Sequence, residues 1–167
     1  DQQETSPGVS VFFPWNDSFS LVAGVHRGFS PSGPGSSGVS AEESVNYEAG
    51  LRFQRGELFA EAIGFFSDYS NLLGRCRISD FGCQPGDEFS GGAVEIYGLE
   101  TMLDYSMPLG EEFSFSLKGS YTYTHSEFQD SFLSTFSQFG IVRAGDELPY
   151  LPQHMANVDA RLTNSSW

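Results

Sequence analysis

The sequence predicts an all-β, antiparallel fold whose strands cross a membrane, and three observations support this prediction. Residues 113–125 alternate strictly between apolar and polar side chains, which is typical of a β-strand with one apolar and one polar face. The connections between predicted strands alternate between short and long, so the long ones fall at one end. No run approaches the ~18 consecutive apolar residues of a transmembrane helix, so a membrane crossing would use strands.

Residues 113–125 give the clearest predicted strand. At about 3.3 Å per residue and a tilt of about 40°, it would rise ~33 Å, whereas the apolar band of an outer-membrane barrel is ~25 Å tall. Its apolar face carries Phe113, Phe115, Leu117, Tyr121 and Tyr123. The tyrosines lie near one end, as in the aromatic girdle of a membrane interface. We interpret this face as lipid-facing, with Lys118 toward the lumen; the alternative is a long strand of a soluble protein.

The N-terminal part contains two predicted strands. Residues 9–13 have the pattern of the end of a strand, which a turn at 14–17 closes. A second strand follows over 18–27, where apolar and small polar residues alternate. Residues 27–41 are rich in Gly, Ser and Pro and are too many for a hairpin turn, so we expect a long loop there.

A hairpin is predicted from strands at 44–54 and 57–69, joined by Arg55-Gly56. Glycine supplies the positive φ that a two-residue turn requires. With these two residues at the tip, Phe53 faces Leu58, and the following pairs are Leu51 with Ala60 and Ala49 with Ala62. The outward face of the second strand then carries Leu58, Ala60, Ala62, Gly64 and Phe66. The inward face carries Glu61, but also Phe59, Ile63 and Phe65, which a water-filled lumen does not predict.

Three further strands are predicted at 93–105, 113–125 and 154–163. A short turn around 108–110 separates the first two, and long connections occupy 71–92 and 127–152. Brief turns on one side and large loops on the other are typical of outer-membrane barrels, in which the large loops are extracellular.

Composition narrows the class of partner. The chain has 167 residues, enough for one domain, with 39% hydrophobic and 15% aromatic residues, 19 glycines and a net charge of −14. Nucleic acid is not an expected partner, because phosphate binding needs a basic surface. The acidic excess indicates solvated loops; divalent cations at a lipopolysaccharide surface are the alternative.

Cys76 and Cys83 lie together in the second long connection. Two cysteines in one loop can close a small disulfide ring, which would place the loop in an oxidising compartment. The alternative is two unrelated thiols. A zinc site is not expected from two thiols without a nearby histidine.

Several stretches share the motifs of a known family in order and spacing. They are Gly-Val-His-Arg-Gly-Phe-Ser-Pro at 24–31, Glu-Ser-Val-Asn-Tyr-Glu-Ala-Gly at 43–50, Phe-Phe-Ser-Asp-Tyr-Ser-Asn-Leu-Leu-Gly at 65–74, Gly-Leu-Glu at 98–100 and Leu-Pro-Tyr-Leu-Pro-Gln-His at 148–154. Over residues 19–163 this series resembles the barrel of TonB-dependent outer-membrane receptors, and it is most similar to the ferric-dicitrate receptor branch.

The resemblance implies a 22-stranded barrel around an N-terminal plug that takes up ferric chelates with energy from TonB. Residues 1–167 would then supply about six or seven strands, without the plug and without the closing C-terminal strands. The implied partners are a ferric chelate, outer-membrane lipid and lipopolysaccharide, and the TonB complex through the absent N-terminal region; no cofactor is implied. The implied location is the outer membrane of a Gram-negative cell. A plug would also give Phe59, Ile63 and Phe65 a surface to pack on.

No catalytic constellation is present in the sequence, so we do not expect an enzyme. Capture of an anionic ferric chelate needs guanidinium or ammonium groups in the outer vestibule. Four arginines fall in or beside the predicted extracellular loops, namely Arg27, Arg75, Arg77 and Arg143. Solvated loop charge is the alternative for each. Arg52, Lys118 and Arg161 would face the lumen, where they would pair with Glu48, Glu61, Glu100 or Asp159. His26, His125 and His154 lie near strand ends, where interfacial or hydrogen-bonding roles are favoured over metal binding.

Two other functions fit parts of the pattern. An outer-membrane adhesion or structural barrel would have similar strands, and an upstream plug domain would distinguish a transporter from it. A soluble carbohydrate-binding β-sandwich would use the Tyr and Phe rows as its core and would show two packed sheets.

Overall fold

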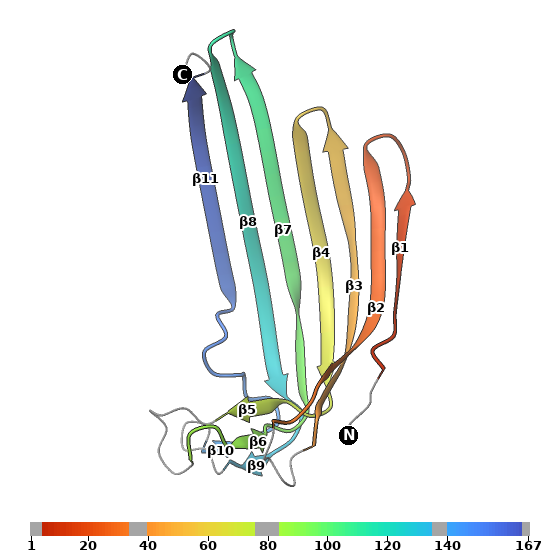
Figure 1. Cartoon of the computed structure of the whole chain (residues 1–167), viewed down its shortest axis with the longest axis vertical. Coiled ribbons are helices and arrows are strands. Elements are labelled where there is room, and N and C mark those ends of the chain that lie inside the picture. Colours follow the sequence, from red (N-terminus) through yellow and green to blue (C-terminus); the bar gives the residue numbers. More distant parts are fainter. Residues whose placement is uncertain (1–4, 34–39, 76–83, 135–139, 165–167) are drawn as a thin grey trace.

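A computed structural model describes residues 5–33, 40–75, 84–134 and 140–164, which form one large sheet with long connections at one end (Figure 1). The sheet has seven strands in the order β1-β2-β3-β4-β7-β8-β11, and every neighbouring pair is antiparallel. The strands are β1 (Gly8–Pro14), β2 (Phe19–Ser30), β3 (Glu42–Arg55), β4 (Leu58–Tyr69), β7 (Val94–Leu109), β8 (Phe113–Phe128) and β11 (His154–Asn164).

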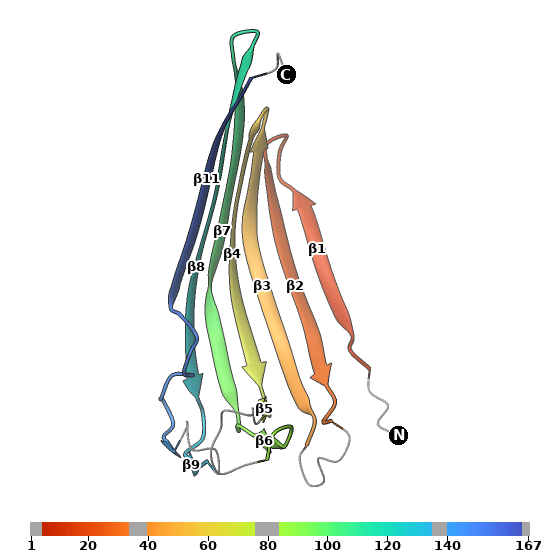
Figure 2. The ribbon, with the colours of Figure 1, turned by 60° about the vertical axis from the view of Figure 1, so that its left-hand side comes forward.

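Each predicted strand is present, and the predicted alternation of connections is confirmed. The turns β1–β2, β3–β4 and β7–β8 lie at one end of the sheet, and the three long connections lie at the other (Figures 1 and 2). β7 and β8 have 16 residues each, which exceeds the usual soluble strand of about 5–6 residues. The described chain forms a single-layered main sheet rather than two packed sheets, so the β-sandwich alternative is wrong.

The register of the β3–β4 hairpin differs from the predicted one by two residues. Arg55 pairs with Leu58 and Phe53 pairs with Ala60, so the tip consists of Gly56 and Glu57. Gly56 has φ 58° at the first central position, which is where a type II′ turn requires glycine. The turn therefore forms one residue later than predicted. Because side chains repeat every two residues along a strand, the shift leaves every outward residue on its predicted face.

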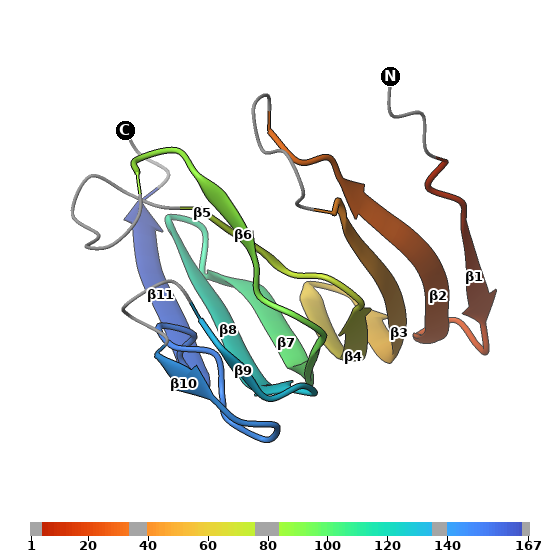
Figure 3. The same ribbon diagram turned by 90° about the horizontal axis from the view of Figure 1, so that it is seen from below.

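The sheet is curved, and its two faces differ in composition. Figure 3 shows the strands as an arc, with the small hairpin β5–β6 on the concave side. The register places Phe113, Phe115, Leu117, Tyr121 and Tyr123 on one face of β8, in line with the apolar residues of its neighbours. That face is convex, because Leu72, which directly precedes β5 on the concave side, packs on Val94 and Phe128 of the opposite face. The exposed large apolar side chains of the main sheet all lie on the convex face except Phe12, Met102 and Met155.

Charged side chains are scarce on the apolar part of the convex face. Tyr97 and its cross-strand neighbours form a row across the convex face near the long connections. Between that row and the short turns at the other end, the convex face of the seven described strands carries a single Asp, Glu, Lys or Arg side chain, Arg55 at the β3–β4 turn. Thr101 also lies on that face, and its hydroxyl donates to the Tyr121 carbonyl at 3.2 Å, so its polar group is satisfied. Such a surface suits contact with lipid, where an unsatisfied polar group costs several kcal/mol. In the described part of the chain, no helix is long and apolar enough to span a membrane.

The long connections contain two small hairpins that the sequence analysis did not predict. β5 (Leu73–Arg75) pairs with β6 (Glu88–Ser90), and β9 (Phe132–Leu133) pairs with β10 (Ile141–Val142). Val142 packs with Val94 and Phe128 from the concave face in the buried core of the described chain. That core lies at the long-connection end of the sheet, because elsewhere one layer of strands has nothing to pack against.

Candidate functional site

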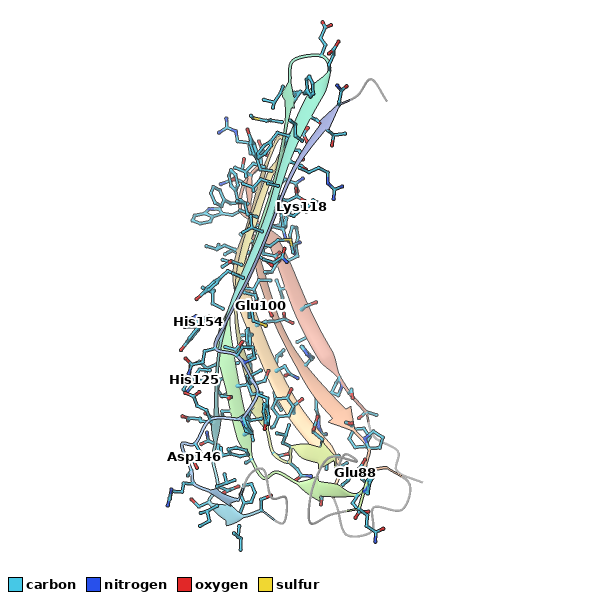
Figure 4. All side chains as sticks on the ribbon, turned by 90° about the vertical axis from the view of Figure 1, so that its left-hand side faces the viewer. Glu88, Glu100, Lys118, His125, Asp146 and His154 are labelled. Carbon is cyan, nitrogen blue, oxygen red and sulfur yellow. The ribbon has the colours of Figure 1, made fainter. Side chains whose placement is uncertain are left out.

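The concave face carries paired charges along its middle. Arg52 donates to Glu61 from Nε at 2.6 Å, and Lys118 contacts Asp104 with Nζ to Oδ2 at 2.8 Å. Arg161 lies 4.0 Å from Asp159 on β11. The prediction that Arg52, Lys118 and Arg161 share this face is therefore confirmed, and so are the acidic partners of Arg52 and Arg161; the partner of Lys118, Asp104, is not among the predicted acids. Figure 4 shows Lys118 on one side of the sheet and His125 and His154 on the other.

Each of the three inward apolar side chains of β4 has a neighbour within the sheet itself. The Arg52 guanidinium carbon lies 5.8 Å from the centre of the Phe59 ring. The Phe65 ring lies over Gly98, and a Cβ added to Gly98 would be 2.8 Å from the ring. Ile63 lies beside Gly50, and a Cβ added to Gly50 would be 2.8 Å from the Ile63 side chain. A large side chain on one strand thus covers a glycine on the next. Contacts within the sheet therefore provide part of the packing surface that a plug is expected to give these three side chains.

Glu100 is an exposed carboxylate near the middle of the concave face (Figure 4). No side chain of the described ranges forms an ion pair with it, and its direct neighbours are Ile63 and Thr122. Glu48 is only loosely engaged, with His26 Nδ1 at 3.6 Å from its Oε1. These two carboxylates are therefore open to contact with whatever occupies the concave side. From the sequence alone, these two carboxylates are expected only as partners for basic residues.

An aromatic row crosses the convex face at the long-connection end. Tyr47, Phe66, Tyr97 and His125 are direct cross-strand neighbours on β3, β4, β7 and β8. Ring centroids are 6.2 Å apart for Tyr47–Phe66 and 5.0 Å apart for Tyr97–His125. Aromatic rows of this kind mark the membrane–water interface of barrels. The prediction of a girdle at this end is supported, with histidine as one of its members.

A row of carboxylates lies one step beyond the aromatic row on the same face. Asp68 pairs in register with Glu95, and Glu95 pairs with Glu127. Like charges directly opposite each other on a sheet are destabilising, so this arrangement is not explained by stability. No group of three or more His, Cys, Asp or Glu within the described ranges is arranged to hold a metal ion.

The four arginines proposed as ligand contacts do not form one cluster in the described part of the chain. Arg27 lies on the convex face and donates to Glu43 at 2.7 Å, so its charge is already paired. Arg143 is exposed in a turn, where its backbone N–H donates to Asp146 Oδ2 at 2.7 Å. The connection holding Arg143 is bonded to β8, four strand spacings or about 19 Å from β2.

The remaining predicted site residues fall in the second long connection. Arg75 ends β5 opposite Glu88, and its side chain lies outside the described residues. Cys76, Arg77 and Cys83 also lie outside the described residues. The predicted disulfide and the predicted ligand contacts of Arg75 and Arg77 therefore remain predictions.

Acidic side chains fasten the long connections to one another. Glu42 accepts the Leu73 N–H at 3.0 Å, and Glu88 accepts the Gly33 N–H at 2.6 Å. Asp130 accepts the Ala93 N–H at 3.4 Å. Part of the acidic excess is therefore structural rather than simply solvated. The partners are 31 to 55 residues apart in sequence, so no local pattern could have shown these bonds.

The comparison with known families decides which class of barrel this sheet comes from. The model of the family described as TonB dependent receptor-like, beta-barrel, matches residues 1–167. The chain belongs to this family. The family consists of transporters rather than enzymes, and its barrels reside in the outer membrane, in agreement with both predictions.

Two curated relatives are iron-regulated outer membrane virulence proteins from an El Tor and a classical strain of Vibrio cholerae serotype O1. They are 31% and 29% identical to this TonB-dependent receptor segment over 143 residues, which is 80% of this chain and 19% of each relative. The siderophore receptor PirA from Pseudomonas aeruginosa has a similar fold, with a TM-score of 0.51 and 24% identity over 74% of this chain and 27% of that chain. The chain thus spans about a fifth of the length of these curated relatives.

Proposed function

We propose that the protein of which this chain is a part imports a ferric chelate across the outer membrane, with energy supplied through TonB. The chain contributes seven adjacent strands of the barrel wall and three extracellular connections. The observation that carries the proposal is the division of the sheet, with a convex face that is apolar and uncharged between Arg55 and the aromatic row, and paired charges on the concave face. Family membership supports it, as do relatives that are named for iron regulation and siderophore reception.

The proposed ligand is an anionic chelate such as ferric citrate or a ferric siderophore. Arg75 and Arg77 are the proposed contacts of this segment, because they flank Cys76 in an extracellular connection and would be held by a Cys76–Cys83 ring. A ring reduces the ordering cost of binding. Arg27 is a weaker candidate, since Glu43 neutralises it on the convex face. Outer-membrane lipid and lipopolysaccharide are the proposed partners of the convex face.

The test uses Arg75→Ala, Arg77→Ala and the double variant in the intact receptor. A charge-assisted contact contributes about 1.5–3 kcal/mol, so losing one should weaken ferric-citrate binding roughly 10- to 150-fold. Arg55→Ala is the matched control, because Arg55 lies at the opposite, short-turn end of the sheet. Binding and growth under iron limitation would be measured, with an unrelated siderophore for comparison.

Two outcomes would contradict different parts of the proposal. Unchanged affinity in the double variant would mean that Arg75 and Arg77 are solvated loop charges that do not contact the chelate. The proposal of transport would still stand. Failure of the wild-type receptor to bind any ferric chelate would overturn the transport assignment itself.

A further inference from the structure

The C-terminal limb of the third long connection runs along the end of β8. Backbone bonds join Phe128 N to Asp146 O at 2.9 Å, Gly145 N to Phe128 O at 2.8 Å and Thr124 N to Gln153 O at 2.9 Å. The Leu148 N–H donates to Ser126 Oγ at 3.1 Å. Residues 143–153, which we call the return limb, are thus docked on β8 by a few bonds rather than by a continuous ladder. Side-chain contacts can therefore add appreciably to its attachment.

His125 lies between this return limb and its own strand. Its Nδ1 is 3.7 Å from Glu147 Oε1 on the limb, and its Nε2 is 3.8 Å from Glu127 Oε2 on β8. The side chain is 23% exposed, so water can reach it while most of the ring is covered. Gln153 Nε2 lies 2.8 and 2.9 Å from the two Glu147 oxygens, which holds that carboxylate toward the ring.

The number of protons on this imidazole decides how many carboxylates it can bind. A neutral imidazole has one N–H and one lone pair, whereas the cation has two N–H donors. The neutral ring can donate to Glu127 or to Glu147 and presents a lone pair to the other. Only the cation attracts both at once. The two distances exceed those of hydrogen bonds, so closing either contact requires a movement of the side chains.

The charges around His125 come from every element packed on it. β8 contributes Tyr123 and Glu127, β7 contributes Tyr97 directly opposite and Glu95 beyond it, and the limb contributes Glu147. β11 contributes His154, whose Nδ1 is 2.8 Å from the Tyr121 hydroxyl oxygen. Apart from His154, these ionisable neighbours of His125 are carboxylates and tyrosines.

We propose that His125 is a protonation-dependent clasp that fastens the return limb to β8. Histidine is the side chain whose charge ordinarily changes between about pH 5 and 8. The clasp is closed when His125 is a cation bound to Glu127 and Glu147, and it loosens as the pH rises and the proton leaves. The limb lies beside the aromatic row, so its docking controls how the extracellular edge is covered. This inference does not depend on which chelate the receptor carries.

The experiment measures backbone hydrogen exchange of the return limb in the intact receptor in detergent micelles, at pH 5.5 and pH 8.0, corrected for the intrinsic pH dependence of exchange. The wild type should show about two- to fivefold stronger protection of the limb at the lower pH, because the one ion pair that joins the limb to β8 is His125 with Glu147. His125→Gln and Glu147→Gln should both abolish the difference.

His154→Gln is the matched control, because His154 belongs to the same aromatic region but faces Tyr121 rather than the limb. It should retain the pH dependence. Glu147→Gln keeps the test decisive if His125→Gln disturbs folding, since Glu147 lies in the connection and not in the barrel wall. A wild type without pH-dependent protection, or the same dependence in both the His125 and Glu147 variants, would overturn the proposal.

Discussion

Lys118 and Asp104 pair directly across β8 and β7, with Nζ and Oδ2 2.8 Å apart on the concave face. The preceding residue, Leu117, pairs in register with Tyr105 on the convex face. Two consecutive residues thus meet opposite surroundings, one a polar lumen and the other the apolar band. The pair offers a direct test of the membrane orientation, because one substitution can be placed on either side.

Leu117→Arg should destabilise the folded receptor by roughly 2–4 kcal/mol, since it places a cation near the bilayer midplane. Lys118→Arg should change stability little, because the guanidinium can still reach Asp104. Urea unfolding of the intact receptor in lipid vesicles measures both. Equal losses at the two positions would contradict the assignment of the convex face to lipid.

Gly98→Ala should destabilise the receptor by about 1–3 kcal/mol, as overpacking in a filled space does. An added Cβ would overlap the Tyr123 carbonyl oxygen and meet the Phe65 ring at 2.8 Å. Gly64→Ala is the matched control on the adjacent strand, because its added Cβ meets nothing closer than 3.8 Å. Unfolding midpoints in vesicles compare the two. A control as unstable as Gly98→Ala would argue against the close approach of β7 and β8.

The strands and their faces are predictable from sequence because a period of two is a local property. The turn at Gly56 lies one residue from its predicted place, since two neighbouring positions could each supply the tip, but the face of β4 is unaffected. The loop hairpins are not predictable, because β9 and β10 have two residues each and owe their burial to Val94 and Phe128 on distant strands. For the candidate site, the sequence predicts only which arginines fall in or beside the loops. It does not predict that Arg27 is paired with Glu43, because that contact depends on the register between β2 and β3.

Glu95→Gln should stabilise the receptor at low ionic strength. Glu95 stands directly between Asp68 and Glu127, and removing its charge relieves two like-charge contacts that each cost about 0.2–1 kcal/mol. The stabilisation should shrink as salt is added, because exposed charges are screened. Glu43→Gln is the control with the opposite sign, since it removes the carboxylate that pairs with Arg27. A salt-independent effect, or a loss of stability in Glu95→Gln, would mean that the acidic row has a bound counterion.

Cys76 and Cys83 should form a disulfide in the second long extracellular connection. The bond would hold Arg77 inside a short ring and Arg75 directly beside it, and closing such a ring typically stabilises the folded loop by about 2–4 kcal/mol. Peptide mapping of the intact receptor without reductant should recover the two cysteines in one linked fragment. Replacing both cysteines by serine should weaken ferric-chelate binding less than Arg75→Ala with Arg77→Ala, because the charges remain and only their ordering is lost. Two free thiols in protein taken from the outer membrane would disprove the pairing, and a double-serine variant weaker than the double-arginine variant would show that the ring itself carries the binding surface.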